Sequence, residues 1–96
     1  MRFLRSARQS ALSDAELIAE YRHGGGKQAL SLLFDRYTHL VFGVCMKYLK
    51  DEDDSKDATM QVFEKLMDDL GKHEVVHFKS WLYTVAKNHC LMTIRT

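Results

Sequence analysis

The chain has 96 residues, which is enough for one domain with a modest hydrophobic core and too few for a large enclosed active site. Hydrophobic residues make up 46% of the sequence and charged residues 28%, values that argue against disorder, while a net charge of +1 indicates no particular partner. There is no proline, no apolar run of membrane-spanning length and no cysteine pair at metal-binding spacing, so we expect a cytoplasmic all-α protein with two reduced core thiols.

The N-terminal part is predicted to hold a flexible basic arm followed by a short helix. Residues 1–12 contain three arginines and few periodic apolar residues, and they lack the continuous apolar segment of a secretory signal. Ser13 with Glu16 three residues later forms a capping box, so we expect a helix to begin at Asp14. The three glycines at 24–26 end that helix, because backbone entropy there opposes helix formation.

The second predicted helix, from about Lys27 to about Lys50, is the longest in the chain. One stripe along it is apolar, and further apolar residues lie off that stripe, so the helix is apolar over much of its circumference. A helix of this kind packs against more than one neighbour. We therefore expect it to be the central member of a compact bundle of about four helices, which the short connections also favour.

The third predicted helix follows an acidic turn that begins at Asp51, where carboxylates are favoured by capping and by the helix dipole. Gly71 is expected to end this helix. The residues expected to be buried are Met60, Val62, Phe63, Leu66, Met67 and Leu70. Those expected to point outward are Asp57, Gln61, Glu64, Lys65 and Asp68. The helix is thus predicted to present a polar, largely acidic outer strip.

The fourth predicted helix, from His77 to Arg95, combines an apolar face with a basic strip that carries an aromatic ring. We expect the apolar face to hold Phe78, Trp81, Leu82, Val85 and Met92. His89 is expected near its centre. Lys79, Tyr83 and Lys87 recur every four residues, so they lie in line on the polar side, where no acid occurs from Lys79 onward. Such a strip suits a nucleic-acid backbone and unstacked bases, although a merely solvated face has the same pattern.

A metal-binding pattern precedes the fourth helix, because His73, Glu74 and His77 match H-E-x-x-H. In that pattern two histidines on one helical face bind zinc and the glutamate acts as general base. The chemistry also needs a continuous helix, a third protein ligand and a walled cleft, and only His89 or Cys90 remain as further ligands. We therefore expect no metal, no cofactor and no enzymatic activity, and keep a zinc hydrolase as an alternative.

Two segments together resemble the sigma-70 family of bacterial RNA polymerase sigma factors, in particular the extracytoplasmic-function (ECF) group. They are Asp57–Phe63, with the sequence DATMQVF, and Phe78–Asn88, with the sequence FKSWLYTVAKN. The similarity covers about Ser13 to Arg95, so residues 13–96 are expected to form the helical domain called region 2. In that family the first motif binds the clamp coiled coil of the polymerase β′ subunit. The second motif and the loop before it bind the promoter −10 element and help to melt it.

The resemblance implies two sets of binding residues in this sequence. The implied contacts to the non-template strand of the −10 element are His77, Lys79, Ser80, Trp81, Tyr83, Thr84, Lys87, Asn88 and Arg95. The implied polymerase contacts are Asp54, Asp57, Gln61, Glu64 and Lys65. The loop from Lys72 to His77 is expected to hold flipped bases together with Tyr83. Met60 occupies the usual glutamine position, with Gln61 one place later, and Met92 replaces a common aspartate.

Sigma factors of this group continue into a second helical domain that recognises the −35 element, so we expect this chain to be a fragment or an excised domain. The resemblance implies core RNA polymerase and promoter DNA as partners, an anti-sigma factor as a further candidate, and no membrane. A helical interaction or dimerisation module, in which the basic strip is only solvated, is the alternative from another class.

Overall fold

The computed structural model describes residues 11–24, 27–72 and 75–95. Within these ranges the regular structure consists of four α-helices: α2 (Asp14–Arg22), α3 (Lys27–Leu49), α4 (Glu52–Lys72) and α5 (Phe78–Arg95). The predicted all-α fold is therefore confirmed. The expected basic arm falls almost entirely outside the described residues and stays a prediction.

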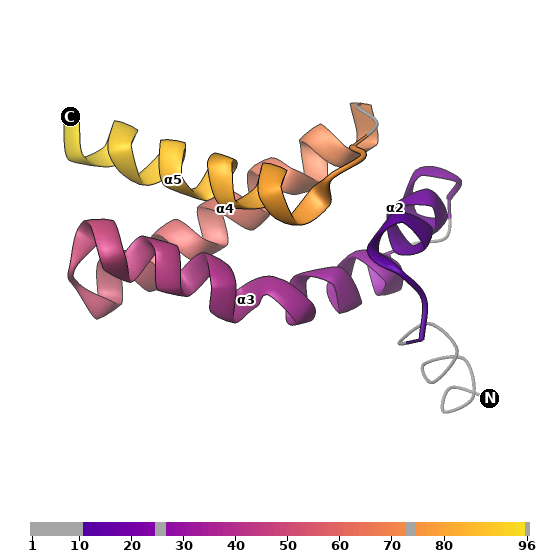
Figure 1. Cartoon of the computed structure of the whole chain (residues 1–96), viewed down its shortest axis with the longest axis horizontal. Coiled ribbons are helices and arrows are strands. Elements are labelled where there is room, and N and C mark those ends of the chain that lie inside the picture. The colour runs from indigo at the N-terminus through magenta and orange to yellow at the C-terminus, as the bar shows by residue number, and fades with distance from the viewer. Residues whose placement is uncertain (1–10, 25–26, 73–74, 96) are drawn as a thin grey trace.

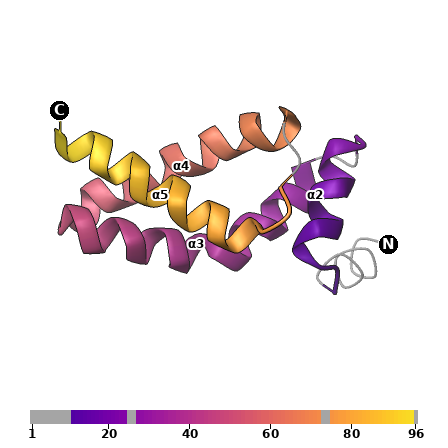
Figure 2. The same cartoon turned by 45° about the horizontal axis from the view of Figure 1, so that its top comes forward.

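Three of the helices run lengthwise and the fourth packs at one end. α3 and α5 run in the same direction (Figure 1). α4, which lies between them in the sequence, runs in the opposite direction. After a turn of 45° the three long helices still lie side by side, while α2 sits at the end where α3 begins (Figure 2). α3 packs against each of the other three helices, which confirms its predicted central place.

The helix ends follow the local signals in the sequence. The backbone N–H of Glu16 donates to Ser13 Oγ at 3.1 Å, and the N–H of Ser13 donates to Glu16 Oε1 at 3.0 Å, so the predicted capping box is present. Asp51 caps α4 in a similar way, because its Oδ2 accepts the N–H of Asp54 at 2.8 Å. Beyond α2, Gly24 has a φ of 83°, a left-handed conformation that glycine adopts without steric cost.

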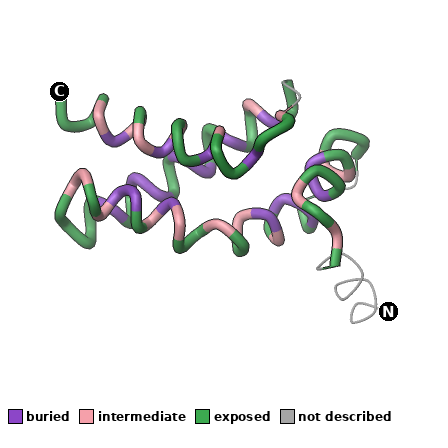
Figure 3. Tube along the Cα trace, in the orientation of Figure 1, coloured by how far each residue is buried: buried purple, intermediate pink, exposed green. Residues whose placement is uncertain are grey.

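The hydrophobic core lies between the helices and receives side chains from all four of them. Buried positions follow the inward side of each ribbon, while the outer turns are exposed (Figure 3). The largest fully buried apolar side chains are Leu17, Leu33, Leu66, Leu70, Leu82, Val41 and Val62. Two further buried side chains, Cys45 of α3 and Cys90 of α5, lie in contact. The pKa of Cys90 is raised to about 12, chiefly by burial and then by the hydrogen bond and charge of Cys45. Both are free thiols, as predicted.

Three methionines expected in the core are instead on the surface. Met60 is 64% exposed, Met67 is 40% exposed and Met92 is 62% exposed. Helical geometry explains the error, because residues two apart lie about 160° apart around a helix. Met60 cannot share a face with the fully buried Val62, nor Met92 with the fully buried Cys90.

Two other predictions need smaller corrections. α4 does not end at Gly71 but continues to Lys72. His89, expected near the centre of the core face, is only half-buried and faces α4 at the edge of the core. α5 buries the small side chain of Ala86 in its central part, and this lets the helix approach α3 and α4 closely.

Candidate nucleic-acid interface

Nearly all residues predicted to contact DNA lie on the accessible side of α5. The exposed ones are His77, Lys79, Ser80, Tyr83, Thr84, Asn88 and Arg95. Trp81 and Lys87 are half-buried, so their side chains reach the surface from the edge of the core. The structure therefore gathers the predicted set on one helix and on the residue just before it.

The charge on this side of α5 is positive. Lys79, Lys87 and Arg95 form no ion pair with any carboxylate in the described part of the chain. Thr84 uses its hydroxyl internally, donating to the carbonyl oxygen of Ser80 at 3.1 Å. Unneutralised cations at intervals along one helix are suited to phosphates, which they bind by releasing counterions.

A cavity of about 550 Å³ opens at the N-terminal end of α5. Its lining residues are Asp69, Val75, Val76, His77, Ser80, Trp81 and Thr84. Tyr83, which we expected to act with the loop, is not among them. Asp69, which α4 contributes to the lining, was not predicted from the sequence. Val75 and Val76 belong to the loop from Lys72 to His77 that was expected to hold flipped bases, and Val76 is 79% exposed.

Aromatic contacts connect Trp81, which lines the cavity, to α3. Phe78 is buried and its ring meets the ring of Trp81 at a centroid distance of 6.1 Å. On its other side Phe78 makes an edge-on contact with Tyr37 of α3 at 5.3 Å. The half-buried Trp81 therefore packs on Phe78, which in turn packs on Tyr37, so a row of three rings connects Trp81 to α3.

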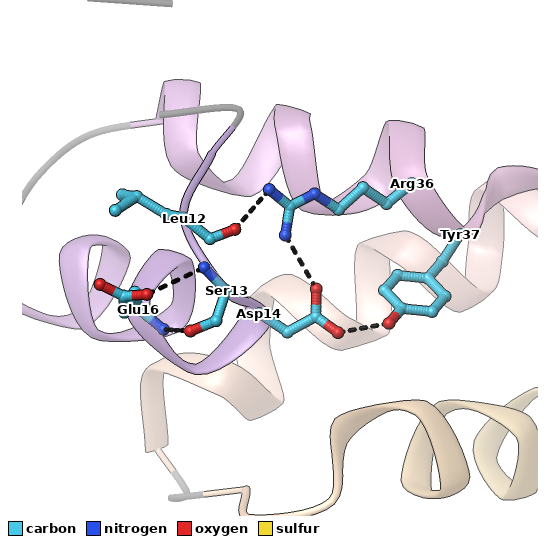
Figure 4. Close-up of polar contacts among 6 residues, drawn as sticks. All are labelled: Leu12, Ser13, Asp14, Glu16, Arg36 and Tyr37. Carbon is cyan, nitrogen blue, oxygen red and sulfur yellow. Dashed lines mark hydrogen bonds and ion pairs between the residues drawn. The ribbon is translucent and has the colours of Figure 1, made fainter. Parts of the chain in front are cut away.

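The end of that row is fixed by polar contacts with α2 (Figure 4). The Tyr37 hydroxyl donates to Asp14 Oδ2, and Arg36 Nη1 pairs with Asp14 Oδ1 at 3.0 Å. Arg36 Nη2 also donates to the carbonyl oxygen of Leu12 at 2.5 Å. Burial, then the hydrogen bond and charge of Asp14, raise the pKa of Tyr37 to about 12, while Arg36 opposes this shift. α2 is thus tied to the helix that supports the cavity wall.

The predicted polymerase contacts lie on α4. Asp54, Asp57, Gln61, Glu64 and Lys65 are all exposed, as expected. One of them also faces α5, because Gln61 Oε1 lies 2.8 Å from Nε2 of His89. Burial, together with the positive charge of Lys65, lowers the pKa of His89, so the ring is neutral at pH 7. In the tautomer with a proton on Nε2, the ring donates to the Gln61 amide.

The zinc alternative loses its structural basis. His73 and Glu74 lie outside the described residues, but Val75 to His77 are not helical and α5 begins only at Phe78. His77 therefore does not lie on a helix, whereas the H-E-x-x-H pattern requires both histidines on one helical face. In the described ranges, no three His, Cys, Asp or Glu side chains come together as a metal site.

Comparison with known proteins identifies one family. The family described as Sigma-70 region 2 matches residues 33–96. The RNA polymerase sigma-H factor of Pseudomonas aeruginosa is 30% identical over 81 residues, an alignment that covers 79% of this chain and 42% of that protein. The chain thus spans less than half the length of this relative. No solved structure matches the chain.

The fold and the candidate site define an all-α domain that packs a helix with an acidic outer face against a basic, ring-bearing one. The family match covers most of the chain, and the chain belongs to the sigma-70 region 2 family. Proteins of the sigma-70 family are transcription initiation factors and not enzymes, so the prediction of no enzymatic activity is confirmed. None of the described helices is long and apolar enough to cross a membrane.

Proposed function

We propose that this chain is the domain of an ECF-type sigma factor that binds core RNA polymerase and the promoter −10 element in the bacterial cytoplasm. The observation that carries the proposal is the cavity at the start of α5, which is walled by Trp81 and shares His77 and Ser80 with a neighbouring pocket that Lys79 lines. A ring-walled recess close to an unpaired lysine provides what an unstacked base and its phosphate require.

The proposed role in promoter opening is the capture of single-stranded bases. The cavity volume of about 550 Å³ falls in the range of about 300 to 1,000 Å³ typical of small-molecule sites, so it admits one base with part of its sugar. Stacking on a ring contributes roughly 1 to 3 kcal/mol per base. Ser80, Thr84 and Asn88 supply groups that hydrogen-bond base edges. Melting then draws on binding energy alone, without ATP.

The proposed role in polymerase binding belongs to the outer face of α4. Asp54, Asp57 and Glu64 lie exposed there without an ion pair to another described side chain. An acidic helix face is complementary to a basic helix such as one in a β′ clamp coiled coil. Because α4 and α5 pack together, the same unit holds polymerase on one side and promoter DNA on the other.

Single-stranded DNA binding tests the DNA half of this proposal. We expect fluorescence anisotropy with a fluorescein-labelled mixed-sequence 20-mer to give an affinity that falls as salt rises, with single strand preferred over duplex. Lys87→Ala should weaken binding and reduce the slope of log K against log salt by about 0.7, the share of one phosphate on a single strand. Lys56→Ala is the matched control, because Lys56 pairs with Glu52 on α4 at 3.4 Å.

Three results would argue against DNA binding by α5. They are no binding by folded protein at low salt, a salt slope unchanged in Lys87→Ala, and equal losses in Lys56→Ala and Lys87→Ala. A chain that forms a stable dimer and binds no DNA would instead favour the interaction module.

A further inference from the structure

The first turn of α2 lines a second cavity beside the candidate DNA site. This cavity has a volume of about 260 Å³, and α2 contributes Asp14 and Ala15 to its lining. Its other lining residues come from the loop and the first turn of α5, and they include His77, Lys79 and Ser80. The sequence analysis assigned all three of these to DNA binding, yet no residue of α2. The structure thus places an unassigned carboxylate beside the residues expected to hold a base.

Asp14 is paired on both of its carboxylate oxygens. Its Oδ1 lies 3.0 Å from Arg36 Nη1, and its Oδ2 accepts the hydroxyl of Tyr37. An unpaired carboxylate beside Lys79 would repel the phosphates of a nucleic acid, because like charges at short range raise the free energy of binding. With a cation and a hydroxyl as partners, Asp14 is instead suited to hold the side chains that it binds.

A continuous series of contacts leads from Asp14 to the wall of the larger cavity. The Tyr37 ring, whose hydroxyl Asp14 binds, meets the buried Phe78 ring edge-on at 5.3 Å. Phe78 meets the Trp81 ring at 6.1 Å, and Trp81 lines the cavity of about 550 Å³. The backbone N–H of Trp81 also donates to the carbonyl oxygen of His77 at 3.0 Å. The series therefore ends both at the Trp81 ring and at the loop residue before α5.

The exposure of the rings distinguishes positioning from ordinary core packing. Phe78 is buried, but Tyr37 and Trp81 are both half-buried, so the row of rings is open to solvent at its two ends. A half-buried ring has neighbours on its inner side only, and these neighbours decide which of its staggered rotamers is populated. A hydrogen bond at the Tyr37 end and a packed ring at the Trp81 end supply this restraint.

We propose that Asp14 is a positioning residue for DNA binding. Through Tyr37 and Phe78 it holds the Trp81 ring and the first turn of α5 in the orientation that receives an unstacked base, and it does not touch DNA itself. This inference rests on the proposed function and adds a role for α2. It also predicts a sign, because removing this negative charge should weaken DNA binding, whereas electrostatics alone predicts tighter binding.

Fluorescence of the free 96-residue chain tests the positioning step without DNA. Trp81 is the sole tryptophan, so the intrinsic emission reports on its ring. In Asp14→Ala and in the milder Tyr37→Phe, we expect the emission to shift to longer wavelength and acrylamide to quench it more strongly. Asp35→Ala is the matched control for charge, because Asp35 is an exposed carboxylate of α3. His89→Ala controls for stability, because it removes a hydrogen bond to α4.

Binding of the labelled 20-mer tests the effect on the DNA site. We expect Asp14→Ala and Tyr37→Phe to weaken the affinity by at least about fivefold, the lower end of what the stacking of one base contributes. The slope of log K against log salt should stay at the wild-type value, because no phosphate contact is lost. Lys87→Ala, in contrast, should lower that slope. Circular dichroism establishes that each variant is folded, and Tyr37→Phe suffices if Asp14→Ala is not.

The outcomes separate this inference from the proposed function. Wild-type binding that is unchanged or tighter in Asp14→Ala and Tyr37→Phe overturns the inference and leaves the proposed function standing. An equal loss of affinity in His89→Ala also overturns it, since the cause would be lost stability. So does an unchanged Trp81 emission in both variants, because the effect would not pass through the ring. If the folded wild type binds no single-stranded DNA, the proposed DNA binding fails, and the inference fails with it.

Discussion

The contact between Tyr37 and Asp14 is predicted to make a measurable contribution to stability. Tyr37→Phe removes the hydroxyl that donates to Asp14 while keeping the ring against Phe78. Hydrogen bonds to charged groups contribute about 1.5 to 3 kcal/mol, and the Asp14 side chain is 26% exposed, so solvent screening reduces this to about 1 to 2 kcal/mol. For a domain of this size the loss corresponds to a fall in Tm of about 4 to 16 °C.

The same contact predicts a dependence on pH. The folded-state pKa of Tyr37 is raised from 10.0 to about 12. A group with a raised folded pKa stabilises the fold fully below its unfolded pKa and loses that contribution as pH rises through the folded pKa. The difference in unfolding free energy between wild type and Tyr37→Phe should therefore be constant from pH 7 to 9 and shrink between about pH 10 and 12.

Urea unfolding followed by circular dichroism measures both effects. Tyr48→Phe is the control, because Tyr48 is also on α3 and half-buried, and no hydrogen bond of its hydroxyl to a described residue is present. We expect it to change stability little. A Tyr37→Phe protein within about 0.3 kcal/mol of wild type, or equal losses in both variants, would refute the reasoning, since surface substitutions alone produce changes of that order.

Two further predictions concern α4 and its contact with α5. His89→Ala removes the partner of Gln61 and should cost about 1 kcal/mol at pH 7.5. Because the folded-state pKa of His89 is lowered, the wild type should lose stability as pH falls below about 6.5. Urea titrations at pH 7.5 and 5.0 should show a smaller loss in His89→Ala. An identical loss in both proteins would contradict the lowered pKa of His89. Ser55 Oγ is buried with no hydrogen-bond partner among the described residues, so Ser55→Ala should leave the Tm unchanged or raise it, and a clear fall would show that the hydroxyl is bonded.

Features set by neighbouring residues in the chain could be predicted from the sequence. The Ser13–Glu16 capping box and the start of α2 depend on groups three residues apart. The bounds of α3 and α5 follow from long periodic patterns that glycines or acidic turns interrupt. The implied DNA-binding residues from Lys79 to Arg95 also lie on one side of α5, because their spacing places them there.

Features that depend on which neighbour covers which flank could not be predicted. Met60 and Met92 are apolar like their neighbours, and they stay outside the core because the packing of the helices buries Val62 and Cys90, which lie about 160° away around the helix. The Gln61–His89 contact joins residues 28 apart, and no local pattern indicates it. The cavity is lined by Asp69 from α4 and Val76 from the loop, and no local sequence pattern indicates that these two residues lie close together.

The most direct test of the account is calorimetric titration of the wild-type chain into an isolated β′ clamp coiled coil. We predict micromolar or tighter binding, about −8 kcal/mol or better, that weakens with added salt because Asp57 and Glu64 pair with basic side chains. No heat of binding from protein shown to be folded by circular dichroism would contradict the polymerase-binding role.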